Sequence, residues 1–288
     1  MLSTIIISRN ESTNIIECLR TLRWCHQVIL IDSSTDNTIA LARKALPKIT
    51  VVSRPATSNF SSLRNLGLKL AQYPWVLYID ADHRVTKQLQ QEIIRTIKKP
   101  GECVGFRIRQ LDWMYGKLLS HGETIHIHHT LLGKQNSGKW QGTVHEKWNL
   151  VGPIGALKSP LHHYPHPTLT EFSDHLNRWS TLAAKQFLAL GEQPRLWKVI
   201  VYPLGKFFLN YVIRLGFLDG FPGLVMAIAM SWHSFNVRVK MLEFNAPKAE
   251  IKMAALTTIC PSEPKILLSA SEAIVLVPAI SSGDITRK

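Results

Sequence analysis

The sequence predicts an α/β fold, in which a mostly parallel, Rossmann-like sheet is flanked by helices and followed by a helical region. In the first hundred residues, short β-branched and aliphatic runs alternate with segments whose apolar residues recur at helical spacing. This alternation, with short connections, is typical of parallel strands with helices on both faces of the sheet. From residue 168 onward only the helical spacing continues, which predicts a C-terminal helical appendage.

The expected elements follow one another closely along the chain. Residues 4–8 are almost entirely β-branched, as in a strand buried on both faces. Further strands are expected over 28–31, 50–52, 75–79 and 103–109, and helices over 14–22, 36–46, 60–71 and 87–98. Residues 111–166 are rich in His, Gly and Trp and are expected to be irregular.

The second half of the chain has a different pattern. Helices are expected over 168–190, 195–216 and 221–243. We therefore divide the chain into an α/β domain over 1–166, a helical region over 167–245 and a poorly ordered tail over 246–288, where Pro, Ser and Ala mix with short apolar runs.

The charge balance favours an anionic partner. Lys and Arg number 34 against 20 Asp and Glu, a formal net charge of +14. Nucleic acid, a phosphorylated substrate and an anionic membrane face all fit this charge, but no compact basic block or nucleic-acid-binding motif supports nucleic acid. The four cysteines lack metal or redox spacing and are expected to be reduced thiols in a cytosolic setting, and the apolar N-terminal run is too short for a signal peptide.

Polar clusters follow three of the expected strands. Asn10-Glu11, Asp32-Ser33-Ser34 and Asp80-Ala81-Asp82 each come where a strand should end. Ligands of parallel α/β sheets bind beyond these carboxyl ends. Asp80 and Asp82 can share one face, and two crowded carboxylates suit a hard divalent cation that also binds phosphate oxygens. The pattern therefore predicts a metal site that holds a diphosphate.

With these motifs in order, the chain resembles the family 2 glycosyltransferases, which have the GT-A fold. The resemblance covers about residues 3–150. It rests on the opening strand with its Asn10-Glu11 turn, on the second strand with its Asp-x-Ser-Thr-Asp-x-Thr signature, on Arg64-Asn65-Leu66-Gly67 and on Asp80-Ala81-Asp82. It implies a GT-A catalytic domain over 1–166.

Two later segments resemble bacterial lipopolysaccharide-core glucosyltransferases. Residues 142–146 match their Val-His-Glu motif, and residues 214–223 match their Arg-x-Gly-Phe-x-Asp-Gly segment. Two positions depart from the relatives' pattern: His83 replaces a Glu, and Thr130-Leu131-Leu132 replaces an Arg-Leu-Phe segment.

The resemblance implies a nucleotide-sugar donor, of UDP type, bound with Mg²⁺ or Mn²⁺. Glu146 is the candidate general base, which takes the proton of the acceptor hydroxyl and so leads to inversion at the anomeric carbon. Alternatives remain for single residues: Asp32 can close an Asx-turn, Arg64 can be a solvated helix charge, and Glu146 can be a surface residue. The candidate donor-binding residues are Glu11, Asp32, Arg64 and Asp80.

The candidate metal ligands are Asp82 and a late histidine. Eight of the twelve histidines lie between 121 and 166. A structural zinc site is disfavoured because no cysteine joins this group. A role in the divalent-metal shell, taken by His162 with His163 as the alternative, agrees better with the resemblance, and the other histidines are expected to pack in loops or to contact acceptor phosphate.

Residues 196–235 are aromatic and aliphatic, with Lys198, Lys206 and Arg214 between them. The longest clean apolar run, 221–232, is shorter than the roughly 20 residues of a spanning helix. A helix lying in the headgroup plane of an anionic membrane fits this composition, while packing against the catalytic domain is the alternative.

The sequence thus predicts an inverting, metal-dependent glycosyltransferase at the cytoplasmic face of a bacterial inner membrane. It would transfer a sugar to a lipid-linked glycan, the lipopolysaccharide core. The alternatives are the same fold acting on another acceptor, such as capsule or a protein glycan, a non-catalytic sugar-nucleotide-binding scaffold, and a nucleotidyltransferase, which would leave the Val-His-Glu motif unexplained.

Overall fold

The computed structural model describes residues 1–57, 59–123, 125, 127–142, 146–165 and 168–245. Residues Met1–Asn245 form one compact unit. The predicted tail over 246–288 lies outside the described residues, and the boundary at 166 between the catalytic domain and the helical region stays a prediction.

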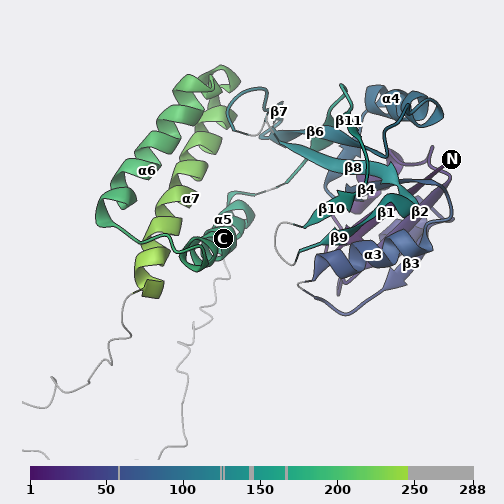
Figure 1. Ribbon diagram of the computed structural model, residues 1–288, viewed down its shortest axis with the longest axis horizontal. Helices are drawn as coiled ribbons and strands as arrows, with labels where there is room; N and C mark the ends of the chain where they lie inside the picture. The colour runs from purple at the N-terminus through teal and green to yellow at the C-terminus, as the bar shows by residue number, and fades with distance from the viewer. Residues whose placement is uncertain (58, 124, 126, 143–145, 166–167, 246–288) are drawn as a thin grey trace, which may run out of the picture. The chain divides into compact units, whose positions relative to one another are not determined.

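A mixed sheet forms the α/β part of the molecule (Figure 1). The strands β3, β2, β1 and β4 are parallel, and β8 runs antiparallel between β4 and β6. The predicted α/β class, with a C-terminal helical region, is therefore confirmed. In spatial order the strands are β3 (Thr50–Ser53), β2 (Gln27–Asp32), β1 (Leu2–Ser8), β4 (Trp75–Asp80), β8 (His128–Lys134), β6 (Gly105–Met114), β12 (Leu161–His163) and β5 (His83–Val85), while β7 (Lys117–Leu118) and β11 (Ile154–Ala156) also pair with β6.

Helices and a small second sheet complete the described chain. The helices are α1 (Ile15–Arg20), α2 (Thr38–Ala45), α3 (Phe60–Leu70), α4 (Lys87–Lys98), α5 (Leu169–Ala189), α6 (Leu196–Phe208) and α7 (Phe221–Asn245). Short turns of helix occur at η2 (Gln135–Ser137), η3 (Leu209–Ile213) and η4 (Gly216–Asp219). The strands β9 (Gly138–Gln141) and β10 (Lys147–Leu150) pair antiparallel as the second sheet.

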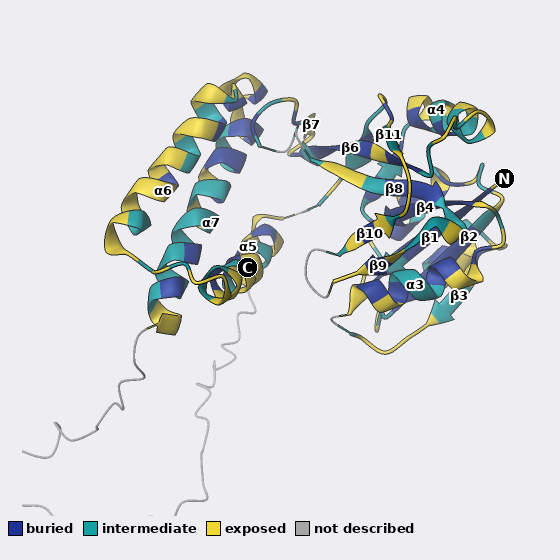
Figure 2. Ribbon diagram, in the orientation of Figure 1, coloured by how far each residue is buried: buried dark blue, intermediate teal, exposed yellow. Residues whose placement is uncertain are grey.

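The core lies around the three strands that the sequence predicts most clearly (Figure 2). Ile6 of β1, Leu30 of β2 and Leu77 of β4 are fully buried, because helices cover both faces of the parallel strands. Burying each such side chain contributes roughly 1.5–3 kcal/mol. Gly67 lets α3 approach this core, since a Cβ there would lie 2.5 Å from Ile5. The last glycine of the Arg-Asn-x-Gly motif thus sets the distance between helix and sheet.

The expectation that residues 111–166 are irregular was wrong. Strand β6 continues to Met114, and the strands β7 to β12 all lie in this segment. They have only two to seven residues each, so too few positions alternate to give a clear pattern. β12 pairs with both β6 and β5, which brings residues 161–163 to the edge of the sheet where β4 ends.

The helix expected over 195–216 ends earlier than predicted. α6 ends at Phe208, a π-helical turn covers Leu209–Ile213, and Leu215 adopts a left-handed conformation with φ 58°. The turn η4 then leads into α7. This irregular segment contains most of the Arg-x-Gly-Phe-x-Asp-Gly sequence.

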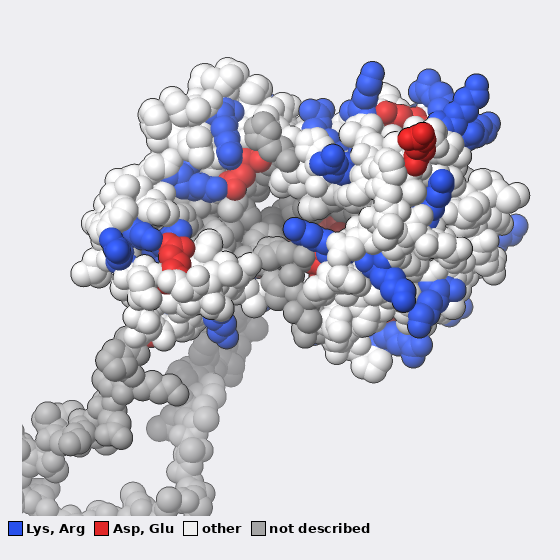
Figure 3. All heavy atoms as spheres, in the orientation of Figure 1, with Lys and Arg blue, Asp and Glu red and all other residues white. Residues whose placement is uncertain are grey.

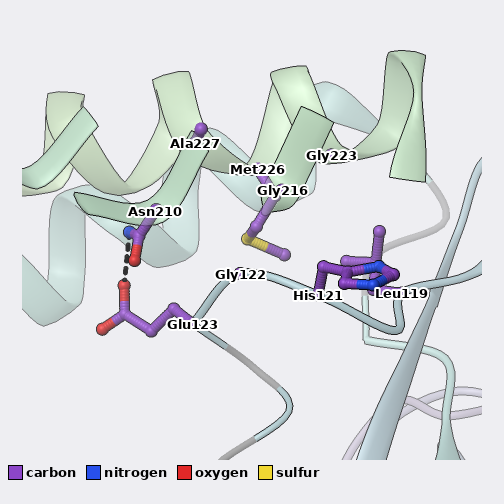
Figure 4. A pocket seen from close by; sticks show the side chains of 9 residues that line it. All are labelled: Leu119, His121, Gly122, Glu123, Asn210, Gly216, Gly223, Met226 and Ala227. Carbon is purple, nitrogen blue, oxygen red and sulfur yellow. Dashed lines mark hydrogen bonds between the residues drawn. The ribbon is translucent and has the colours of Figure 1, made fainter. Parts of the chain in front are cut away.

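The segment 119–123 joins the sheet to the C-terminal helices, and we call its polar contacts the clasp. The buried Asp219 accepts hydrogen bonds from the backbone N–H of Ser120 (3.0 Å) and His121 (2.8 Å). Glu123 pairs with Lys206 (2.7 Å) and accepts a hydrogen bond from Asn210 (2.9 Å; Figure 4). An apolar cluster lies beside it, made by Met114, Leu119, Phe172, Leu176, Met226 and Ala229. The clasp and this cluster together hold α5 to α7 against the β6 end of the sheet.

Candidate active site

Asp82 lies just beyond β4 and contacts a histidine from a distant strand. The Nε2 atom of His163 is 3.1 Å from Asp82 Oδ2, and its Nδ1 atom is 2.7 Å from Asp112 Oδ1. Gln110 also reaches His163 Nδ1, at 2.7 Å. Asp112 and Gln110 are two residues apart on β6 and therefore point to the same face of the sheet. One imidazole thus joins the end of β4 to β6 through two carboxylates.

The contact between Asp82 and His163 changes the pKa of both groups. Burial alone would lower the pKa of His163, but Asp82 and Asp112 raise it to about 10. Burial would raise the pKa of Asp82, but His163 and His83 lower it well below its usual range. At neutral pH the pair is therefore an imidazolium facing a carboxylate.

The residues around Asp82 fit a divalent cation. Asp82, His83 and His163 each offer one ligand atom, and these atoms lie within 4.8 Å of one another. Asp82 Oδ1 is buried, and no partner for it occurs within the part of the chain that the structure describes. An orphaned carboxylate oxygen beside two imidazoles is a suitable donor set for a metal ion.

His163, and not His162, occupies the position expected for the late metal-binding histidine. His162, the residue chosen from the sequence, accepts a hydrogen bond at Nδ1 from Trp113 Nε1 (3.2 Å). Neighbouring residues of a strand point to opposite faces, so only one of the two can reach Asp82. We therefore reassign the candidate metal role to His163.

Metal binding at Asp82 and His163 is expected to strengthen as the pH rises. A metal can bind His163 only after the imidazolium has lost its proton, and the pKa of His163 is about 10 in the metal-free protein. Below that pH, the association constant for Mn²⁺ should rise about tenfold per pH unit. Titration calorimetry at pH 7 and pH 8 measures this change. An association constant that is the same at both pH values would show that the metal does not displace this proton.

Arg64 brings the candidate base and a candidate donor-binding residue, Asp80, together. Its guanidinium lies 3.0 Å from Glu146 Oε2 and 3.7 Å from Asp80 Oδ1. The guanidinium carbon also lies 4.5 Å from the ring centre of Trp140. Arg64 and Glu146 are both largely buried, so neither is the solvated surface residue considered as an alternative. One fixed cation thus lies between two carboxylates that are far apart in the sequence.

Glu11 lies in the electrostatic field of the two strand-end aspartates. Burial raises the pKa of Glu11 to about 7, and Asp82 and Asp80 contribute to the increase, while a hydrogen bond from Asn14 (3.0 Å) opposes it. The structure therefore brings Glu11 to the same edge of the sheet as Asp80 and Asp82, as the sequence predicts.

The carboxylate of Asp32 is used within the protein. Asp32 is fully buried and accepts hydrogen bonds from the Ser8 hydroxyl and from the Ser34 N–H (2.9 Å) and hydroxyl (2.7 Å). These bonds form the turn considered as the alternative role, and they hold the ends of β1 and β2 together. Contact between Asp32 and a nucleotide base stays a prediction.

Sequence reasoning missed several residues of this site. Asp112 and Gln110 were not singled out, although two buried polar residues at alternate positions of an apolar strand are a usable signal. Trp140, whose ring contacts the Arg64 guanidinium, could not be found from the sequence, because this contact arises only where β9 packs against α3. Of the Val-His-Glu motif, Glu146 is described, whereas 143–145 lie outside the described residues.

A cleft of about 1030 Å³ contains Arg64, Asp80 and Glu146. The candidate base and two of the candidate donor-binding residues, Arg64 and Asp80, therefore face one shared space, whereas Glu11 and Asp32 do not line this cleft. His83 also lines the cleft, whereas Asp82 is not among its lining residues. His83 replaces the Glu of the relatives; its Nδ1 accepts a hydrogen bond from the Asp80 N–H (3.0 Å), and its burial lowers its pKa.

The chain is similar to a known sequence family, to curated relatives and to solved structures. A family model described as glycosyl transferase family 2 matches residues 3–153. The lipopolysaccharide core biosynthesis glycosyltransferase LpsC of Rhizobium meliloti is 27% identical over 256 residues, which cover 86% of this chain and 94% of LpsC. An uncharacterized glycosyltransferase of Rickettsia conorii is 24% identical and covers 84% of this chain and 90% of its own length. Among solved structures, S. aureus TarS 1-349 in complex with UDP-GlcNAc is 15% identical, with a TM-score of 0.44, and the match covers 84% of this chain and 91% of that one.

Proposed function

The chain belongs to glycosyl transferase family 2, and from this membership we propose that it is an inverting, metal-dependent enzyme that transfers a sugar from a UDP-type donor to a lipid-linked glycan. That it is a glycosyltransferase follows from the family and from the likeness to LpsC over most of both chains. The lipopolysaccharide core is the acceptor that this relative suggests.

The observation that carries the proposal is the link from Arg64 to Glu146 and Asp80. It holds the candidate base next to the edge of the sheet where a nucleotide diphosphate would bind. A scaffold that only bound the donor would have no need of a largely buried carboxylate held at this position.

In the proposed reaction, Glu146 accepts the proton of the acceptor hydroxyl as its oxygen attacks the anomeric carbon. The bond from that carbon to the diphosphate breaks on the opposite face, so the configuration is inverted. Arg64 donates hydrogen bonds to the diphosphate oxygens, for which its fork of N–H groups is suited. Asp82 and His163, with His83 beside them, would hold Mg²⁺ or Mn²⁺, which when bound neutralises charge on the departing nucleotide.

Release of free nucleotide tests this proposal directly. The protein is incubated with a panel of nucleotide sugars and lipopolysaccharide-core acceptors, with Mn²⁺, with Mg²⁺ or with EDTA. The proposal expects release that requires both the acceptor and the metal, and a product of inverted anomeric configuration by NMR. Binding of a donor without turnover on any lipopolysaccharide, capsule or protein acceptor would instead support the non-catalytic scaffold.

The apolar surface of α6 supports association with a membrane. Its most exposed apolar residues recur every four positions: Leu196 (76%), Ile200 (65%), Leu204 (66%) and Phe208 (55%). Such a stripe lies along one side of a helix. Figure 3 shows Lys and Arg gathered over the α/β part, whereas the helical region presents mostly other residues. Among the described residues, one segment, Leu196–Ile213, is long and apolar enough to cross a membrane.

Contacts within the protein favour an in-plane helix over a spanning one. Lys206, in the last turn of α6, pairs with Glu123 in the clasp, and Ser231 of α7 donates a hydrogen bond to the carbonyl of Pro203 (2.8 Å). α6 therefore lies against α7 and presents only its outer side to a lipid surface. This placement agrees with a peripheral enzyme at the cytoplasmic face of the inner membrane.

Two charges introduced into the stripe are expected to remove membrane binding. Ile200→Asp with Leu204→Asp should lower the fraction that sediments with anionic vesicles at least tenfold, because each buried aliphatic side chain contributes roughly 1.5–3 kcal/mol. Leu169→Asp, at a residue 58% exposed on α5, is the control and should bind like the unchanged protein. High salt should reverse most of the binding. No sedimentation of the unchanged protein in low salt would contradict the proposal.

A further inference from the structure

The cleft that holds Arg64 and Glu146 has a second wall, outside the segment that the family model matches. Trp179, Leu182 and Ala183 of α5 and Met230 and His233 of α7 form this wall. A volume of about 1030 Å³ is at the upper end of the roughly 300–1,000 Å³ usual for a pocket with one ligand. The cleft therefore has room for a second ligand beside a nucleotide sugar.

The second wall is held in place by the same helix faces that pack on the sheet. Phe172 and Leu176 of α5 belong to the apolar cluster beside the clasp, and Trp179 and Ala183 continue their stripe at helical spacing. On α7, Met226 and Ala229 belong to this cluster, and Met230 and His233 follow within one turn. The wall thus continues a packed interface and is fixed relative to Glu146.

The chemistry of the second wall is that of a surface for sugars. Trp179 is 47% exposed, with a ring tilted against His175 at 5.4 Å, so part of the indole can meet the C–H face of a sugar ring. Burial lowers the pKa of His233, and a neutral imidazole has one donor and one acceptor for hydroxyl groups. Among the described residues lining the cleft, the carboxylates are Asp80 and Glu146, both on the catalytic side.

We propose that α5 and α7 form the subsite for the acceptor glycan, with a sugar ring against Trp179 and a hydroxyl bonded to His233. The inference rests on the proposed function and deepens it by placing the acceptor. The attacking hydroxyl would face Glu146 on the opposite wall, while the donor occupies the side of Arg64 and Asp80. The C-terminal helices would then take part in selecting the acceptor as well as in membrane contact.

The test compares two tryptophans of similar exposure on the helices. Trp179→Ala is expected to raise the KM for delipidated lipopolysaccharide-core oligosaccharide about five- to tenfold, while the KM for the donor stays unchanged. Trp179→Phe should keep most of the stacking. Trp232→Ala is the matched control, because Trp232 is 53% exposed, stacks on Phe235 and does not line the cleft. A KM for the acceptor within twofold of the unchanged value in Trp179→Ala would overturn the subsite.

Direct binding separates this inference from the proposed function. Titration calorimetry with the same oligosaccharide, without donor, should show a loss of affinity in Trp179→Ala and none in Trp232→Ala. If the unchanged protein binds the oligosaccharide through Trp179 but turns over no donor, the proposed function fails and the subsite is supported. If turnover is normal and neither tryptophan affects binding, the subsite fails and the proposed function stands.

Discussion

Glu146→Gln is expected to lower the rate of sugar transfer by about 10²–10⁴-fold, the usual contribution of a general base. Glutamine keeps the shape of the side chain and can still accept a hydrogen bond from Arg64, which lies 3.0 Å from Glu146. It is not basic enough to take a proton from a hydroxyl. The affinity for the nucleotide sugar should change less than threefold. Steady-state transfer assays with thermal-shift titration of the donor measure both quantities.

Glu17→Gln is the control for Glu146→Gln. Glu17 also pairs with an arginine, Arg20, but it is exposed and lies on α1, away from the cleft. Its replacement should leave transfer unchanged. If Glu146→Gln transferred sugar at more than a third of the normal rate, Glu146 would not be the base, and its pairing with Arg64 would be structural.

Asp82→Asn is expected to lower metal-dependent nucleotide release by about 10³-fold and to abolish detectable Mn²⁺ binding. The variant replaces the only carboxylate in the group formed with His83 and His163, as far as the described residues show. A neutral amide oxygen does not balance the charge of a divalent cation as a carboxylate does. Electron paramagnetic resonance of bound Mn²⁺ measures the binding without reference to activity.

Asp112→Asn is the comparison variant for Asp82→Asn and is expected to lower the affinity for the metal by less. Asp112 contacts His163 from the side away from Asp82, at 2.7 Å, and so orients the imidazole without belonging to the group of candidate ligands. Loss of such a supporting carboxylate typically costs 10–100-fold in metal affinity. Equal losses in the two variants would mean that His163 is the dominant ligand, and unchanged binding in both would place the metal elsewhere.

The fold could be predicted where strands are buried on both faces. The opening strand and the strand before Asp80 are buried at nearly every position and rich in β-branched or aliphatic residues, and their helices show clear amphipathic spacing. The short strands β8 to β12 could not be predicted from such a pattern. Their regularity comes from pairing with β4, β5, β6 and each other, and a strand of three residues such as β12 has too few positions to show a period.

The site could be predicted in part for a related reason. Glu11, Asp80 and Asp82 follow strands whose ends meet at one edge of a sheet, so their proximity follows from the order of elements. The pair of Arg64 and Glu146 joins residues 82 positions apart, and the choice of His163 over His162 depends on which face of β12 meets Asp82. Both depend on strand pairing that local sequence does not encode.

Helix α3 determines where the hairpin of β9 and β10, which adjoins the candidate base, lies. Asn65 makes two hydrogen bonds with the backbone of Trp140, at 2.9 and 3.0 Å, and Ser61 bonds the carbonyl of Gly142 at 2.5 Å. The neighbouring Arg64 holds Glu146. An inserted residue in α3 would turn everything after it by about 100° around the helix axis. Residues 61–65 must therefore keep their number and order for Glu146 to meet Arg64.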